Sequence, residues 1–134
     1  MVNPAIEGKV YPPTEPYEVG REKIAEFARA TLATGSSEFA APTFPVVIQE
    51  RSMATVLGDP EAEIDFSRVV HGDQRFSFVR PIRAGDVLHS ELEVASVKSL
   101  AGNQLVTFET RIFDSTEQLV CTATSTLVVR GVTE

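Results

Sequence analysis

The second half of the chain alternates apolar and polar residues with a period of two, which is typical of strands that bury one face. Leu88, Leu92 and Val94, for example, lie among charged or polar neighbours. The last such segment is rich in threonine and valine, which favour strands. The pattern predicts strands over residues 66–80, 87–98, 104–113 and 118–130. Because the turns between them are short, we expect an antiparallel meander.

Two helices are predicted before the strands. In residues 21–32, apolar or small side chains recur at the spacing of one helical face, namely Ile24, Phe27, Ala28 and Thr31. A second helix is expected over residues 45–57, because its proline suits a first turn and the following Gly58 suits a helix end. Polar residues interrupt it at positions 49–52, so we expect one of its faces to meet solvent or a partner.

Residues 1–19 are rich in proline, which predicts an extended arm with at most one short edge strand. The order of arm, two helices and four strands is typical of an α+β domain spanning residues 1–134. The apolar second helix is expected to cover the sheet, with the antiparallel sheet wrapped around it as a central helix. Such a sheet leaves edges open, so we expect self-association.

Composition narrows the classes of function. The net charge of −7 disfavours binding to nucleic acid or anionic membranes. The chain contains no apolar run long enough to span a membrane and no secretory signal at its start, so we expect a cytoplasmic protein. The single Cys121 is expected in the core. The sequence carries no zinc motif, and we expect neither a metal nor a cofactor.

Two sets of residues carry a family resemblance. Residues 80–88, Arg-Pro-Ile-Arg-Ala-Gly-Asp-Val-Leu, resemble the R/K-P-V/I-x-x-G-D-x-L motif of MaoC-like hot-dog proteins. These include (R)-specific enoyl-thioester hydratases and 3-hydroxyacyl-thioester dehydratases. A second set is similar to non-catalytic-type subunits of actinobacterial (3R)-hydroxyacyl-acyl-carrier-protein dehydratase, in residues 11–13, 16–24, 27–28, 41–44 and 69–76.

The resemblance implies a hot-dog fold, an acyl-CoA or acyl-carrier-protein thioester as ligand, and a role in fatty acid metabolism. It also implies a dimer, either a homodimer or a heterodimer with a catalytic hot-dog subunit. Catalytic members carry Asp, Asn and His in a D-x-N-P-x-H loop before the central helix, where the Asp and His activate water. The corresponding residues 32–40 contain none of the three.

Three hypotheses therefore stay open. The chain is a subunit of a 3-hydroxyacyl-thioester dehydratase or enoyl-thioester hydratase that contributes acyl-chain binding and dimerisation. Alternatively, it is a non-enzymatic acyl-thioester-binding module that has lost the catalytic loop. The order of elements also allows an α+β ligand binder of another family, although the motifs do not support it.

His71 and Asp73 are the weak candidates for catalysis. A histidine titrates near neutral pH, so His71 could serve as a stand-in base. The alternative is a histidine bonded to strand or turn backbone, with Asp73 at the start of a strand or at an interface. The spacing of the two residues does not demand a dyad.

Four arginines are candidate contacts for a phosphopantetheine phosphate or an acidic carrier protein, because guanidinium groups suit phosphate. They stand out from an otherwise acidic chain, although a solvated strand face would explain them equally simply. These residues are Arg68, Arg75, Arg80 and Arg83.

The start of the second helix is the candidate thioester site. Pro45 removes one N–H donor there, which leaves the Val46 N–H and the Thr43 hydroxyl. A simple helix start is the alternative. The candidate substrate-binding residues are Thr43, Phe44, Val46, Phe76 and Phe78. Aromatic residues on strands could line an acyl channel, or they could belong to the core.

Overall fold

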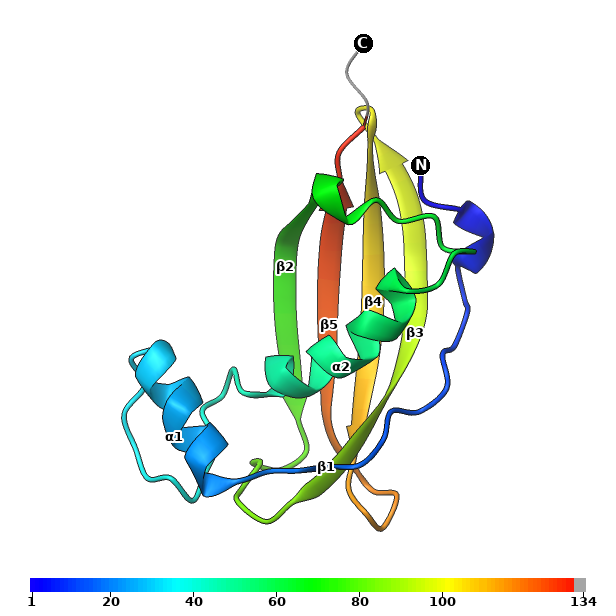
Figure 1. Cartoon of the computed structure of the whole chain (residues 1–134). Helices are drawn as coiled ribbons and strands as arrows, with labels where there is room; N and C mark the ends of the chain where they lie inside the picture. Colours follow the sequence, from blue (N-terminus) through cyan, green and yellow to red (C-terminus); the bar gives the residue numbers. More distant parts are fainter. Residues whose placement is uncertain (132–134) are drawn as a thin grey trace.

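A computed structural model describes residues 1–131 of the chain. Five antiparallel strands form one curled sheet in the order β1-β3-β4-β5-β2 (Figure 1). The strands are β1 (Tyr17–Glu18), β2 (Val69–Phe78), β3 (Val87–Leu100), β4 (Asn103–Phe113) and β5 (Leu119–Val129). The four long strands confirm the predicted strands, and their ends differ from the predicted ends by a few residues. Buried and less buried residues alternate in β3, β4 and β5, whereas β2 is mostly exposed.

The predicted meander is correct for β3, β4 and β5 but wrong for β2. Although β2 precedes β3 in the chain, it pairs with β5 at the far edge of the sheet. The connecting residues 79–86 contain Pro81, which cannot donate to a ladder, and they pass around the end of the sheet (Figure 1). Short turns indicate hairpins only, so they do not locate this crossing.

The helices are α1 (Arg21–Ala30) and α2 (Pro45–Leu57), with short 3-10 turns η1 (Pro4–Ile6) and η2 (Phe66–Arg68). Helix α2 occupies the predicted residues, while α1 ends two residues before the predicted end. In Figure 1, α2 lies across the concave face of the sheet, with β2 to β5 curving behind it. This arrangement confirms the α+β hot-dog fold, in which a sheet wraps around a central helix.

The core consists of two apolar clusters. The first contains Met53 and Phe108, and the second contains Phe44 and Ile112. A set of polar residues, which we call the polar belt, also lies on these elements. Helix α2 and each of the four long strands contribute at least one residue to it. Its members are Gln49, Ser52, Gln74, Ser90, Thr110 and Ser125.

Several residues of the polar belt are hydrogen-bonded to one another. The side-chain amides of Gln49 and Gln74 exchange hydrogen bonds of 3.1 and 2.8 Å, and the hydroxyls of Ser52 and Ser90 are bonded to each other. The hydroxyls of Thr110 and Ser125 are buried without a partner among the described residues. An unpaired buried hydroxyl is costly, so the belt limits the stability of the core.

After the 3-10 turn η1, the N-terminal arm runs along one edge of the sheet and covers it. The Gly8 and Tyr11 N–H groups donate to β3 carbonyls at 2.7 and 2.9 Å. Farther along the arm, β1 continues this edge pairing. The arm is also tied to the end of α2, because Lys9 and the Tyr11 hydroxyl donate to Asp59 at 2.8 and 2.6 Å. These bonds, from Lys9 first and then Tyr11, lower the pKa of Asp59 to about 2.

Candidate functional site

An apolar cavity of about 290 Å³ opens beside the segment that leads into α2. Ala40 and Pro42 form one wall, and the end of β2 with the following turn forms the other, through Phe78, Val79 and Ile82. Phe78 and Val79 are 40% and 68% exposed, although both are apolar. Apolar surface at the mouth of a cavity is typical of a binding site rather than of a sealed core.

The start of α2 lies next to this cavity in sequence, but its donors are engaged. The Val46 N–H donates to the Thr43 carbonyl at 3.2 Å, and the Val47 N–H donates to the Phe44 carbonyl at 2.9 Å. Pro45 has no N–H. A thioester oxygen at this point would therefore have to share a donor or use the exposed Thr43 hydroxyl.

Phe44 is fully buried, so its ring belongs to the core and not to a surface channel. It packs edge-to-face against Phe27 of α1, with ring centroids 5.4 Å apart. Phe76 is half-buried against the same apolar cluster. Phe78 follows on the same face of β2, with its ring centroid 6.4 Å from that of Phe76. Of the three rings, Phe78 lines the cavity.

His71 and Asp73 lie on either side of a β-bulge at Gly72 in β2. The His71 ring Nε2 lies 3.1 Å from the backbone carbonyl of Asp73, whereas the Asp73 carboxylate pairs with Arg75 at 3.1 Å. The two side chains therefore form no acid–base dyad. His71 instead faces a second cavity of about 260 Å³ between β2 and α2, beside Met53.

The connection between the helices, residues 31–44, contains no Asp, Asn or His, and Glu38 is its one ionisable side chain. Leu32 begins the connection with a left-handed backbone, at φ 57°, and its side chain is 90% exposed. A large apolar residue in that conformation is unfavourable. The connection thus lacks the Asp and His of the catalytic loop, and its one carboxylate, Glu38, is exposed.

The four candidate arginines do not form one patch. Arg68 lies at one end of β2, whereas Arg80 and Arg83 follow its other end. The ten residues of β2 span roughly 33 Å at about 3.3 Å per residue. Arg75 points out from the middle of the strand, with 79% of its side chain exposed. A single phosphate could not contact all four.

The guanidinium of Arg80 is already engaged by two carboxylates. Arg80 forms ion pairs with Asp86 at 2.8 Å and with Asp114 at 3.6 Å, and the hydrogen bonds that it donates to Asp86 raise the pKa of Arg80. Asp86 also accepts the Arg83 backbone N–H at 2.9 Å, which explains the Gly-Asp turn of the motif. The Arg83 backbone is thus held in this turn, and the residue as a whole is exposed.

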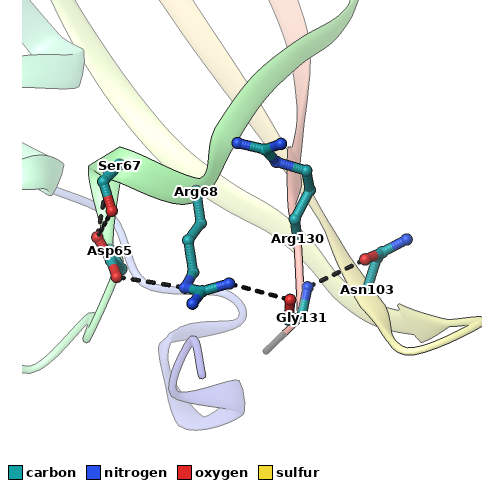
Figure 2. Close-up of a pocket in the computed structure, with 6 residues that line it drawn as sticks. All are labelled: Asp65, Ser67, Arg68, Asn103, Arg130 and Gly131. Atoms are coloured by element: carbon teal, nitrogen blue, oxygen red, sulfur yellow. Dashed lines mark hydrogen bonds and ion pairs between the residues drawn. The ribbon is translucent and has the colours of Figure 1, made fainter. Parts of the chain in front are cut away.

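Arg68 lies in an open, polar cavity of about 610 Å³ at the opposite end of the sheet. Figure 2 shows its guanidinium between Asp65 and the Gly131 carbonyl, at 3.6 and 3.0 Å, while the Arg130 side chain turns away. The two guanidinium groups do not converge, and an aspartate carboxylate lies beside one of them. This cavity is a poor anion site.

Cys121 is fully buried, which confirms its expected place in the core, and burial raises the pKa of its thiol to about 11. A neutral buried thiol is a poor nucleophile. Within residues 1–131, no three His, Cys, Asp or Glu side chains gather closely enough to hold a metal ion. None of the helices in this part of the chain is long and apolar enough to span a membrane.

The sequence reasoning missed the polar belt. Gln49 and Ser52 were expected on a solvent or partner face of the second helix, yet they are only 1% and 2% exposed. Glu50 and Arg51, between them, are exposed as expected. The spacing of three between Gln49 and Ser52 places both on one helical face, which is the feature that could have indicated a shared environment.

Comparison with known proteins identifies the family. Residues 31–131 match the family model described as the MFE-2 hydratase 2 N-terminal domain. The chain belongs to this family. It is also 51% identical to a UPF0336 protein of Leifsonia xyli subsp. xyli, over 97% of each chain. The resemblance to MaoC-like hot-dog hydratases, first drawn from the motifs, is confirmed.

Two solved structures extend the comparison. The HadBC (3R-hydroxyacyl-ACP dehydratase) complex of Mycobacterium tuberculosis superposes with a TM-score of 0.77 at 26% identity, over 92% of this chain and 96% of that one. A MaoC-like dehydratase gives a TM-score of 0.75 at 29% identity, over 96% of this chain but 43% of that one. The domain is therefore of the hot-dog, MaoC-like hydratase/dehydratase type.

The relatives have a longer chain within the matched region. The alignment with the Leifsonia protein runs over 144 positions but covers 97% of the 134 residues here, which is about 130. About 14 positions of the relative thus lack a counterpart in this chain. The Streptomyces griseus relative gives a similar difference, with 141 positions for 95% of this chain.

Proposed function

We propose that this domain binds the acyl thioester in a 3-hydroxyacyl-thioester dehydratase or (R)-specific enoyl-thioester hydratase system of fatty acid metabolism. The observation that carries the proposal is the apolar cavity beside the start of α2, in a domain of hydratase/dehydratase type. The acyl chain packs against Phe78, and the Thr43 hydroxyl lies on the thioester side.

The acid and base for water addition come from another chain. Water addition and loss require a proton acceptor close to the reacting carbons. The loop before α2 lacks the Asp and His of catalytic members, and His71 bonds to backbone rather than to Asp73. On its own the domain is therefore a binding subunit, and the HadBC complex, a dehydratase that is itself a complex of subunits, is the precedent.

Two of the candidate arginines lie at this end of β2, Arg80 in the lining of the cavity and Arg83 three residues later. Arg83 is exposed and follows the same end of β2 as Phe78, whereas Arg80 is held by two carboxylates and Arg68 lies at the far end. We assign Arg83 to the phosphopantetheine or carrier-protein contact. Arg75 is an odd number of strand positions from Phe76 and Phe78, so its side chain points to the opposite face of the sheet.

Binding of a medium-chain 3-hydroxyacyl thioester, measured by calorimetry, tests the proposal. Phe78→Ala removes a side chain that is 40% exposed in the free protein, so ligand burial of that remainder is worth about 1 kcal/mol, or about fivefold in Kd. Phe66→Ala is the matched control, because Phe66 is 67% exposed at the opposite end of β2. Equal effects of the two variants, or no binding to the wild type, would refute this site.

An enoyl-thioester hydration assay separates the dehydratase role from the purely binding one. We expect no turnover by the domain alone and turnover when a catalytic hot-dog subunit is added. If the added subunit is never stimulated, the domain is a non-enzymatic acyl-thioester-binding module. Turnover by the purified domain alone would contradict the assignment of the acid and base to another chain.

A further inference from the structure

The two walls of the apolar cavity beside α2 are joined by backbone hydrogen bonds. The connection before α2 and the turn after β2 each donate one N–H to the other, and both bonds are 2.8 Å long. The residues that form them are Glu38, Ala40, Ile82 and Ala84. We call these two paired segments, residues 38–40 and 82–84, the mouth ribbon. Its residues Ala40 and Ile82 also line the cavity.

Phe39 and Arg83 face each other at the centre of the mouth ribbon. The two hydrogen bonds flank this pair rather than join it. In a pair of this kind the Cα atoms are about 4.5 Å apart and the two side chains lie on the same face. The other face of the ribbon turns to the core, because Ile82 is only 2% exposed. The phenyl ring and the guanidinium therefore project together toward solvent.

Neither side chain of this pair is used by the fold. Phe39 is 48% exposed and belongs to neither apolar cluster of the core. Within residues 1–131, only the backbone N–H of Arg83 is engaged, by Asp86, and its guanidinium has no ion-pair partner. An aromatic face stacks well on a nucleobase, and a guanidinium matches the oxygens of a phosphate. The pair thus combines the two contacts that a nucleotide requires.

The charge around the cavity does not suit an acidic carrier protein. The whole chain carries −7, and Arg80 in the cavity lining is already paired with Asp86 and Asp114. Glu38, on the mouth ribbon itself, is exposed. A large acidic partner would therefore meet a repulsive field. A small ligand needs only the local contact between one phosphate and one guanidinium.

We propose that the thioester reaches this cavity on coenzyme A, with the adenine ring stacked on Phe39 and a phosphate paired with Arg83. This inference rests on the proposed function for the acyl end of the ligand, and it selects coenzyme A over a carrier protein. The acyl chain lies in the cavity, and the nucleotide lies outside it on the mouth ribbon. Ala40 and Ile82 belong to both and connect the two parts of the site.

Calorimetry with one acyl group on three carriers tests the choice of carrier. The ligands are the 3-hydroxyoctanoyl thioesters of coenzyme A, of pantetheine and of an acyl carrier protein. We expect the Kd of the coenzyme A thioester to be lower than that of the pantetheine thioester by about tenfold or more, because pantetheine lacks both the adenine ring and the phosphates. Equal affinity for these two, or tighter binding of the carrier-protein thioester, would overturn the proposal.

Two variants assign the contacts. Phe39→Ala and Arg83→Ala should each raise the Kd of the coenzyme A thioester by about fivefold or more, and neither should change that of the pantetheine thioester. Phe39→Tyr, which keeps the ring, should retain the wild-type affinity. The replaced side chains are exposed, and the hydrogen bonds of the ribbon come from the backbone, so the fold is retained.

The matched controls are Phe66→Ala and Arg75→Ala, which remove an exposed ring and an exposed guanidinium away from the mouth ribbon. They should leave both affinities unchanged. Equal effects of the variants and their controls, or equal weakening of the two ligands, would overturn the assignment of Phe39 and Arg83.

Coenzyme A without an acyl group separates this inference from the proposed function. It should bind to the wild type, and Phe39→Ala and Arg83→Ala should weaken that binding. If it does so while the acyl group adds no affinity, the nucleotide site stands and the proposed acyl cavity fails. If the pantetheine thioester binds but coenzyme A does not, the acyl cavity stands and this inference is overturned.

Discussion

Phe44→Ala tests whether the contact between α1 and the start of α2 is as extensive as the structure indicates. Phe44 is fully buried, and its ring meets Phe27 edge-to-face at 5.4 Å. Replacing a core phenylalanine by alanine costs about 3–5 kcal/mol of unfolding free energy, from lost burial and the cavity left behind. The aromatic pair accounts for about 0.5–1.5 kcal/mol of that cost.

Urea unfolding at one fixed protein concentration measures the effect, since any dimer makes stability depend on concentration. A double-mutant cycle with Phe27→Ala should recover a coupling in the range expected for the ring pair. Phe66→Ala is the control, because Phe66 is 67% exposed and should cost no more than about 0.5 kcal/mol. A loss below about 1 kcal/mol for Phe44→Ala would refute the packing at this helix start.

Three further predictions concern buried or ionised groups. Thr110→Val removes a buried hydroxyl that has no partner among the described residues, so the unfolding free energy should stay unchanged or rise by about 1 kcal/mol. Ser90→Ala should instead lower the unfolding free energy by about 1–3 kcal/mol, because the buried Ser52 hydroxyl loses its hydrogen-bond partner. Because the pKa of Asp59 is lowered from 3.8 to about 2, its ionised carboxylate stabilises the folded state at pH values above 3.8. This stabilisation should be lost as the pH falls from about 4 towards 2. In acid titrations followed by circular dichroism, Asp59→Asn should lack this component of the pH dependence. Cys121 should react slowly with iodoacetamide at about pH 8 in the native protein and rapidly in urea, because burial raises its pKa to about 11; fast native labelling would contradict its burial.

The sequence predicted the local elements of this fold well, because they are determined by local chemistry. Helix α2 begins at Pro45 and ends before Gly58, where a proline and a glycine mark its limits. Strands β3, β4 and β5 follow from alternation, since one face of each packs on the core, whereas β2 contains no fully buried residue. The motif of residues 80–88 correctly indicated the family, and its aspartate forms the turn through the Arg83 N–H.

The sequence could not determine which distant groups meet. The place of β2 beside β5 depends on how the chain crosses the end of the sheet, which no local pattern encodes. In the sequence, Gln49 and Ser52 are typical of surface residues. Only the fold brings Gln74 and Ser90 to them as hydrogen-bond partners. The arginines looked like one basic patch because they are close in sequence, but β2 holds Arg68 and Arg80 at opposite ends.

Backbone amide chemical shifts during titration with a non-reactive 3-hydroxyacyl thioester analogue test the proposed binding role most directly. The proposal predicts shifts at Thr43, Phe78 and Val79, around the cavity. It also predicts that Arg68 and Asn103, at the opposite end of the sheet, stay unchanged. Shifts confined to that far end, or hydration of an enoyl thioester by this domain alone, would contradict the account.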